Sequence, residues 1–325
     1  MSPETASAVV KRLAAECGFD RCGVAAAEPI GRADYLRAWL EAGRAGSMAY
    51  LHRHFALRTD ARNLVDGAKS VIVVALLYRR PQKAPTATGS AEPRGRVASY
   101  AWGDDYHVVV RERLRTMVDR LRELHDGPFD ARTCVDTAPL LEREYAAAAG
   151  IGWIGKNTMI LDHELGSFFF LGAVVTTLEI APDEPLEDRC GTCTACLSAC
   201  PTNAFPAAYE MDASRCISYL TIERRKEIPA GLAEKCGDWI FGCDVCQDVC
   251  PHNRRAPASR EPRFAARLPC PEPALENVLN WTRDDYRAHT RGSAMRRATL
   301  DMFQRNARMA LENHERGSRS ANMIT

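Results

Sequence analysis

Residues 190–201 carry cysteines in a spacing suited to binding iron and sulfide. Cys190, Cys193, Cys196 and Cys200 precede Pro201, which gives the pattern C-x2-C-x2-C-x3-C-P. Thiolates are soft ligands that suit iron, and this run is typical of bacterial proteins that hold two [4Fe-4S] clusters. The stretch therefore predicts a redox cofactor.

A second, incomplete run lies downstream, where Cys243, Cys246 and Cys250 precede Pro251 and where Ile240 occupies the place of a fourth cysteine. The two runs supply seven thiolates, whereas two clusters with four cysteines each need eight. Two further cysteines lie between or near the runs, at positions 216 and 236. One of these two is expected to provide the eighth ligand.

The spacing also predicts how the cysteines are divided between the clusters. In double runs of this kind the fourth cysteine of each run reaches the other cluster. One cluster is therefore expected on Cys190, Cys193, Cys196 and Cys250. The other is expected on Cys200, Cys243, Cys246 and either Cys216 or Cys236.

Zinc binding and disulfide formation are the alternative uses of so many cysteines. Zinc sites usually consist of separated C-x2-C pairs without the trailing C-P. Disulfides require an oxidising compartment, and the N-terminal residues do not resemble an export signal. We therefore expect a cytoplasmic protein with two clusters, whose remaining cysteines are small buried side chains.

The composition is that of a globular protein with two or three domains. The chain has 325 residues, of which 46% are hydrophobic and 26% are charged, and no apolar run approaches the roughly 20 residues of a membrane span. The net charge of +1 does not by itself favour a polyanionic partner. Such a partner would depend on local basic patches, at residues 224–226, at 254–255, and at Arg291, Arg296 and Arg297. Each patch taken alone is more often a solvated helix face.

Hydrophobic periodicity predicts strands and helices that alternate up to about residue 181, which indicates an α/β domain. Helices are expected at 3–17, 33–42, 105–124 and 139–149, and strands at 70–78 and 167–180. Residues 81–96 are rich in Pro, Ala, Thr and Gly and indicate a surface loop. The acidic, proline-flanked stretch 182–188 indicates a domain boundary.

The expected fold class is thus α+β, with three parts. An α/β domain spans residues 1–181, a ferredoxin-like two-cluster module spans 182–255, and a short helical region spans 256–325. The last ten residues are expected to be disordered.

Three glycines, Gly150, Gly152 and Gly155, spell the dinucleotide-binding pattern G-x-G-x-x-G. That fingerprint must follow a strand and open a helix. Here the order is reversed, because the glycines follow an alanine-rich helix and lead into strand-like sequence. The pattern more plausibly marks a tight backbone turn against a bulky neighbour.

Four segments together resemble the epoxyqueuosine reductase family, and the match spans residues 1 to about 255. They are VDTAPLLE at 135–142 running toward GIGWIGKNTMI, SYAWGDDYHVVVRERL at 99–114, CISYLTIERR at 216–225, and FGCDVCQDVCPHN at 241–253. Members of this family are cobalamin-dependent iron–sulfur enzymes that remove the epoxide oxygen of epoxyqueuosine in a tRNA anticodon loop. The resemblance implies the same cofactors, a tRNA anticodon stem-loop as substrate, and an external electron donor for a monomeric enzyme.

The resemblance also implies particular site residues. The family's cysteine before I-S-Y matches Cys216, which makes it the eighth ligand, and the family's proton donor matches Asp136. The family's cobalamin pocket lies between the N-terminal domain and the cluster module. Cobalamin contacts are implied at Arg58, Ile160, Leu171, Ser218 and Asp244, and a tRNA contact is implied at Arg225. Because this family holds cobalamin without a protein histidine on the metal, we expect no cobalt ligand among the histidines.

The acid at position 136 fits the chemistry that the resemblance implies. An epoxide oxygen leaves poorly unless it is protonated, so a general acid must lie close by. An exposed aspartate with a pKa near 3.9 is ionised at neutral pH, so we expect burial beside the corrin to raise the pKa of Asp136. The structural alternative is that Asp136 caps a helix that has Pro139 in its first turn.

Two other functions share parts of this pattern. An electron-carrying ferredoxin would need the cysteines but not the long segment before them, and it would bind no corrinoid. A reductive dehalogenase-like enzyme would share both cofactors, but such proteins usually carry a twin-arginine signal that MSPETASAVVKRL lacks. One departure from the family is the short arginine-rich C-terminal region, because many relatives continue into longer helical repeats. Binding of the tRNA body is therefore expected to differ from that of relatives with the longer repeats.

Overall fold

A four-stranded sheet forms the centre of the N-terminal part of the molecule. The structure is a computed structural model and describes residues 1–80, 92–267 and 270–322. The strands are β1 (Arg21–Ala26), β2 (Ser70–Leu77), β7 (Phe169–Thr176) and β4 (Ala131–Cys134), in the order β1-β2-β7-β4. Every neighbouring pair is antiparallel, whereas alternating strands and helices more often give a parallel sheet.

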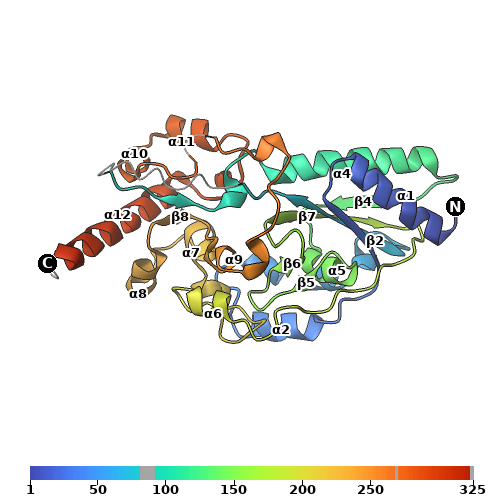
Figure 1. The fold of residues 1–325 in the computed structure, drawn as a ribbon, viewed down its shortest axis with the longest axis horizontal. Helices are drawn as coiled ribbons and strands as arrows, with labels where there is room; N and C mark the ends of the chain where they lie inside the picture. Colours follow the sequence, from blue (N-terminus) through green and yellow to red (C-terminus); the bar gives the residue numbers. More distant parts are fainter. Residues whose placement is uncertain (81–91, 268–269, 323–325) are drawn as a thin grey trace.

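Strand β2 is buried on both faces, as its continuous apolar sequence predicts. Successive side chains point to opposite faces, so Ile72, Val74 and Leu76 pack under helices α1 (Pro3–Glu16) and α4 (Tyr106–Leu124). The alternate residues, from Val71 to Leu77, pack against α5 (Glu142–Ala148). Figure 1 shows α1 and α4 along one face of the sheet and α5 on the other.

Helix α4 approaches the sheet closely because β7 has a glycine beneath it. A Cβ atom added at Gly172 would lie 2.7 Å from Cγ1 of Val110 and 3.0 Å from Cδ1 of Leu114. Asp105 caps the helix by accepting the backbone N–H of His107. The start of α4 therefore lies over the end of the sheet at which strand β7 begins.

The cysteine-rich module lies beside the sheet domain and consists of short elements. They are α6 (Ala195–Ala199), α7 (Ile217–Ile222), α8 (Ala230–Ala233), β8 (Trp239–Phe241) and α9 (Val245–Asp248). Helices α6 and α9 pack on each other. Helix α6 carries Cys196, the third cysteine of the first run, and α9 carries Cys246, the second cysteine of the second run. Outside this module lie α2 (Ala33–Glu41), α3 (Phe55–Thr59) and a small hairpin of β5 (Trp153–Ile154) with β6 (Ile160–Leu161).

The C-terminal region closes the end of the molecule opposite the N-terminus (Figure 1). Its helices are α10 (Leu275–Leu279), α11 (Arg283–Thr290) and α12 (Leu300–Asn322). One hydrophobic core joins residues 97–102, Ile240, Phe241 and Phe303, and strand β3 (Arg96–Val97) pairs in parallel with β8. The core therefore draws on all three of the segments that the sequence delimits.

Several local predictions are confirmed and others are wrong. The helices expected near 3–17, 33–42 and 105–124 and the strands near 70–78 and 167–180 are present within a few residues, whereas β1 and β4 were not predicted. The expected helix at 139–149 begins only at Glu142, and α12 extends through 316–322, where disorder was expected. Most of the predicted loop at 81–96, residues 81–91, lies outside the described residues, as do 323–325. None of the described helices combines the length and apolar character needed to span a bilayer.

The G-x-G-x-x-G glycines follow α5 and enter β5, as expected, and so cannot form a dinucleotide fingerprint. Gly150 has φ +66°, in the left-handed region. A Cβ atom on Gly152 would lie 2.3 Å from the carbonyl oxygen of Leu161 in β6. The pattern therefore serves a tight backbone approach.

Candidate cluster sites and active site

The first predicted group of thiols surrounds a small cavity. Cys190, Cys193, Cys196 and Cys250 all line it, although Cys250 comes from the other run. Cys196 lies in α6, and Cys250 caps the short turn Pro251–Asn253. Burial raises the pKa of Cys190, Cys196 and Cys250, and the neighbouring thiols of the same group raise the pKa of Cys196 and Cys250 further. The structure therefore brings together the first three cysteines of the first run and the last cysteine of the second run, as the spacing predicts.

Two side chains from the β5–β6 hairpin enclose this thiol group. Lys156 donates from Nζ to the carbonyl oxygens of Gly191, at 2.6 Å, and Cys193, at 3.0 Å. The indole N–H of Trp153 is buried without a hydrogen-bond partner and lies beside Cys190. A donor in this position suits a cysteine sulfur that carries negative charge.

The second group of thiols gathers at the start of α7 and around α9. Burial raises the pKa of Cys243 and Cys246, and the charges of Cys216 and Cys200 raise both further. Cys216 caps α7, so the backbone N–H groups of Ser218 and Tyr219 point at its sulfur. The described residues contain no group of three His, Cys, Asp or Glu side chains that would hold a single metal ion.

Cys236 lies near this group but faces the apolar core. It is 1% exposed and packs with Ile217, Leu220 and Trp239. Burial raises its pKa to about 12. Cys216, by contrast, is close enough to Cys243 and Cys246 for its charge to raise the pKa of both thiols. The geometry therefore favours Cys216 over Cys236.

Asp136 lies on the loop between β4 and α5, in a conformation that L residues seldom adopt. Its φ is +51°, and its backbone N–H donates to Oε1 of Glu142 at 2.5 Å. The helix-cap alternative is wrong, because α5 starts six residues later with Leu141 at its cap. The Asp136 side chain is 60% exposed, so its carboxylate is accessible from the surface.

The carboxylate of Asp136 belongs to an acid–base cluster. His107 places Nε2 at 3.1 Å from Oδ2 of Asp136 and Nδ1 at 2.7 Å from Oδ1 of Asp105. Desolvation alone would raise the pKa of Asp136, but hydrogen bonds from His107 and Tyr106 outweigh it, so its pKa lies below the usual range. The rise of this pKa through burial beside the corrin stays a prediction.

The proton-binding groups beside Asp136 shift in the opposite direction. Desolvation would lower the pKa of His107, but hydrogen bonds to Asp105 and Asp136 outweigh it and raise the pKa to about 9. Desolvation and the charge of Asp136 raise the pKa of Glu142 to about 8. At neutral pH the cluster therefore holds its protons on His107 and Glu142.

The implied cobalamin contacts lie around this loop and between the sheet and the cysteine module. Arg58 is half-buried, its Nε has no hydrogen-bond partner, and desolvation lowers its pKa. Ile160 and Leu171 contribute to the apolar face below α5. Ser218 lies beside Cys216 in α7, and the buried carboxylate of Asp244 accepts the backbone N–H of Ser99 at 2.7 Å.

The implied tRNA contact lies on the surface between α7 and the C-terminal region. Arg225 is exposed, and its guanidinium reaches Sδ of Met302 and the carbonyl oxygen of Arg297. Arg297 in turn makes two 2.8 Å contacts with the carboxylate of Glu223 and lies over the Tyr50 ring. Its positive charge lowers the pKa of Asp136, so this surface adjoins the acid–base cluster.

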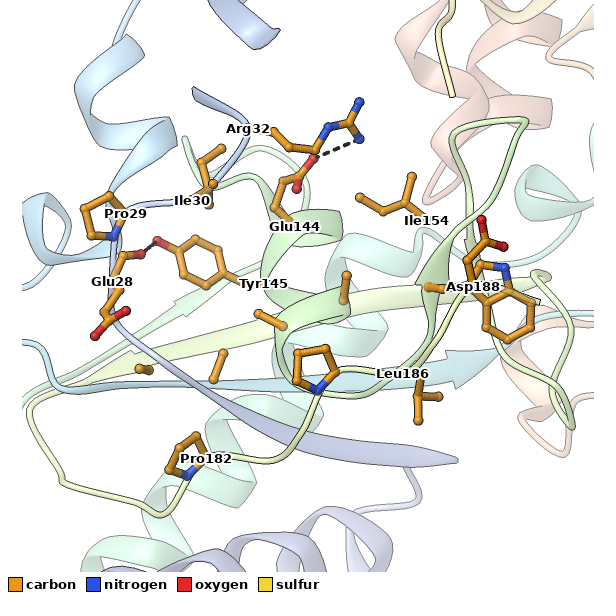
Figure 2. Close-up of a pocket in the computed structure, with 17 residues that line it drawn as sticks. Glu28, Pro29, Ile30, Arg32, Glu144, Tyr145, Ile154, Pro182, Leu186 and Asp188 are labelled. Carbon is orange, nitrogen blue, oxygen red and sulfur yellow. Dashed lines mark hydrogen bonds and ion pairs between the residues drawn. The ribbon is translucent and has the colours of Figure 1, made fainter. Parts of the chain in front are cut away.

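A larger cavity of about 550 Å³ lies beside α5 (Figure 2). It is lined mainly by apolar residues from the loop at 28–32, from α5 and from 182–188. Two of its polar contacts lie within the lining, because Arg32 meets Glu144 at 3.5 Å and the Tyr145 hydroxyl donates to the carbonyl oxygen of Glu28. None of the implied cobalamin contacts lines it.

Two members of the acid–base cluster, His107 and Glu142, were not expected to be functional from the sequence. Both lie inside the segments that carry the family resemblance, at 99–114 and 135–142. The acidic pair Asp104–Asp105 just before a tyrosine and a histidine was the available signal. Only the fold brings that helix start to the loop at residue 136.

Comparison with known proteins places these features in a family. Residues 58–137 match the family described as "Epoxyqueuosine reductase QueG, DUF1730", and residues 189–253 match a 4Fe-4S double cluster binding domain. An epoxyqueuosine reductase of Leadbetterella byssophila is 41% identical over 91% of this chain and 95% of its own length. One from Xanthomonas campestris is 40% identical over 96% of this chain and 88% of its own.

Solved structures agree with the sequence comparisons. A crystal structure of epoxyqueuosine reductase with an epoxyqueuosine-modified tRNA-Tyr stem loop has a TM-score of 0.87 at 32% identity. The Bacillus subtilis enzyme with its catalytic aspartate loop swung out of the active site has a TM-score of 0.86 at 31% identity. Each match covers 94% of this chain and 80% of the other.

Proposed function

The chain belongs to the epoxyqueuosine reductase family, and from that premise we propose that it reduces epoxyqueuosine to queuosine in the anticodon loop of tRNA. The observation that carries this proposal is the combination, in one chain, of eight gathered thiols with the acid–base cluster at Asp136. A relative whose match to this chain extends over 95% of the relative's own length is named epoxyqueuosine reductase. The chain is accordingly an oxidoreductase with a double [4Fe-4S] cluster domain.

We assign Cys190, Cys193, Cys196 and Cys250 to one cluster and Cys200, Cys216, Cys243 and Cys246 to the other. The cavity among the first four thiols and the unpaired indole N–H of Trp153 suit a sulfur-ligated cluster. Two such clusters would store and pass electrons one at a time.

Cobalamin is the second cofactor that we propose. Two buried polar atoms without partners, Nε of Arg58 and Oγ of Ser99, fit a ligand rich in amide and phosphate oxygens. Arg58, Ile160, Leu171, Ser218 and Asp244 would line its site, with Ser218 and Asp244 linking it to the second cluster. When bound, cobalamin would supply a strongly reducing cobalt centre.

Asp136 is assigned as the group that delivers a proton to the epoxide oxygen. Its carboxylate lies on a left-handed turn, and its side chain is exposed enough to reach a substrate. Protonation at that oxygen converts a poor leaving group into water. The loop in a Bacillus subtilis relative occurs in a swung-out position, so this turn is the part of the site that would open for the nucleoside.

The remaining partners follow from the reaction. The anticodon stem-loop of tRNA would lie over the surface that includes Arg225, and an external one-electron donor would reduce the exposed first cluster. We place the enzyme in the cytoplasm as a monomer, with the three segments 1–181, 182–255 and 256–325 as its working divisions.

Turnover of a defined substrate tests the proposal. Protein reconstituted anaerobically with iron, sulfide and cobalamin is given an epoxyqueuosine stem-loop and a low-potential reductant. Conversion to queuosine supports the proposal, and an intact epoxide refutes it. A plain electron carrier would show clusters but no corrinoid spectrum on titration with cobalamin. A dehalogenase would prefer a halogenated substrate to the stem-loop.

A further inference from the structure

His107 is held between two carboxylates in a way that fixes its protonation. Nδ1 faces Oδ1 of Asp105 at 2.7 Å, and Nε2 faces Oδ2 of Asp136 at 3.1 Å. Hydrogen bonds from His107 outweigh desolvation and keep the pKa values of Asp105 and Asp136 below the ordinary range, so both carboxylates are ionised at neutral pH. Ionised carboxylates only accept hydrogen bonds, so both ring nitrogens donate. The ring is therefore an imidazolium that links Asp105 to Asp136.

The surroundings hold this ring rigidly. The ring of Tyr106 stacks on His107 at 4.1 Å and on Phe170 of the central sheet at 4.2 Å, almost parallel to the latter. Asp105 also caps α4 by accepting the His107 N–H, so the side chain that orients the ring is itself fixed. Only 20% of the His107 side chain is exposed.

The charges that face this pair come from several elements. On α4 and its cap these are Asp105 and, through Asp105, Arg111. On the loop and α5 they are Asp136 and Glu142, and Arg297 from the C-terminal region acts on Asp136. Asp105 and Asp136 dominate, because among the described residues only these two hydrogen-bond to the ring.

An ionised Asp136 has no proton of its own to give. We propose that His107 supplies, through Asp136, the proton that the epoxide oxygen takes up, an inference that rests on the proposed function. The proton passes from Nε2 of His107 to Oδ2 of Asp136 and from there to the oxygen. His107 is then a positioning and proton-supplying residue, whereas Asp136 is the one that touches the substrate.

The balance of the step is complete. Two carbon–oxygen bonds break, a carbon–carbon double bond forms, and the oxygen leaves as water after gaining two electrons and two protons. The electrons come from the low-potential donor through the clusters. The first proton comes from His107 by way of Asp136, and the second follows the same route after solvent has reprotonated the imidazole.

The protonated pair also predicts how rate and stability depend on pH. The pKa of His107 is about 9 in the folded protein, above its ordinary value of 6.5. The imidazolium therefore stabilises the fold fully below about pH 6.5, and this contribution is lost as the pH rises through about 9. The rate of the wild-type enzyme is expected to fall over the same alkaline range.

Two variants test this proton relay, from His107 through Asp136 to the epoxide oxygen, in the reconstituted enzyme. His107→Gln keeps an amide donor but has no dissociable proton, so kcat is expected to fall about 100-fold with an unchanged KM for the stem-loop. The alkaline limb of the pH–rate profile, which is the fall in rate near pH 9, is expected to disappear. Asp105→Asn still caps the helix but no longer stabilises the imidazolium, so the limb is expected to move to lower pH. The exposed His163, as His163→Gln, is the matched control and is expected to match wild type.

The outcomes separate this inference from the proposed function. If the wild-type enzyme leaves the epoxide intact, the proposed function fails and proton delivery to the epoxide fails with it, whereas thermal unfolding still tests the imidazolium. In that measurement the difference in Tm between wild type and His107→Gln is expected to be largest near pH 6 and to vanish by about pH 10. A pH-independent difference overturns the imidazolium. Wild-type kcat with an intact alkaline limb in His107→Gln, or a loss that appears only in KM, overturns the relay.

Discussion

At the scale of single residues, the choice between two cysteines decides how the second cluster is held. Cys216 caps α7 and interacts with Cys243 and Cys246, whereas Cys236 faces Ile217 and the rest of an apolar core. Cys216→Ala is therefore expected to remove about half of the iron, because one of two clusters loses a ligand. Cys236→Ala is the matched control and is expected to keep all of it. Iron and sulfide analysis of anaerobically purified protein measures both, and the reverse result would exchange their roles.

Asp136 permits an equally direct test. Asp136→Asn keeps the size of the side chain and most of its hydrogen bonds but cannot pass a proton, so cobalamin and iron contents are expected to stay at wild-type levels. Single-turnover conversion of the stem-loop is expected to slow at least about 100-fold. The exposed Asp126, as Asp126→Asn, is the control. A wild-type rate in Asp136→Asn would remove this residue from the mechanism.

Residue types and spacing predicted which four thiols line the first cavity, but they left the eighth ligand and the acid–base cluster open. The run spacing alone specified which thiols share a cavity, since short loops leave few ways to wrap a cluster. Asp136 came from the family resemblance, and its lowered pKa depends on His107, which is 29 residues away in sequence. Long-range pairs of this kind follow from tertiary packing, which local sequence does not encode.

At the scale of elements, the periodic segments were predictable and the short ones were not. β2 and α4 have long, regular apolar patterns, whereas β4 is a four-residue edge strand with two polar residues. Helix α5 starts late because Asp136 adopts a left-handed conformation and the chain needs six residues to enter the helix. The Asp136 side chain is therefore not used to cap α5, whose cap is Leu141.

The contact between α4 and β7 gives a prediction about stability at this scale. Gly172→Ala places a methyl group 2.7 Å from the branched side chain of Val110, so the free energy of unfolding is expected to fall by about 1–3 kcal/mol. Gly231→Ala is the matched control, because its surroundings are open and the change is expected to stay within about 0.5 kcal/mol. Denaturant unfolding under anaerobic conditions compares the two. Equal stabilities would mean that α4 can move away from the sheet without cost.

At the scale of the whole molecule, the C-terminal region is part of the body that holds the second cluster. Asn306 is fully buried in α12 and donates to the carbonyl oxygens of Thr221 in α7 and Ile240 in β8, at 2.9 and 2.8 Å. Arg305 beside it donates to the carbonyl oxygens of residues 220, 224 and 226. The sequence predicted a short helical tail, but this buried polar seam could not be read from amphipathicity alone.

The seam predicts a large effect from one amide. Asn306→Leu keeps the volume but leaves two buried carbonyls without donors, at a cost of about 1–3 kcal/mol each. Because α7 starts at Cys216, the variant is expected to unfold at a lower temperature and to lose iron from the second cluster first. Asp301→Asn, on the exposed side of the same helix, serves as the control. An unchanged Tm for Asn306→Leu would show that the seam contributes little.

The most direct test of the central claim is the mass of the modified nucleoside before and after reaction. An epoxyqueuosine stem-loop is incubated with the fully reconstituted enzyme and a low-potential reductant, and the nucleoside is then released for mass spectrometry. We expect the loss of one oxygen atom, and this loss should depend on both the clusters and cobalamin. An unchanged mass with the complete enzyme, or an equal loss when cobalamin is left out, would contradict it.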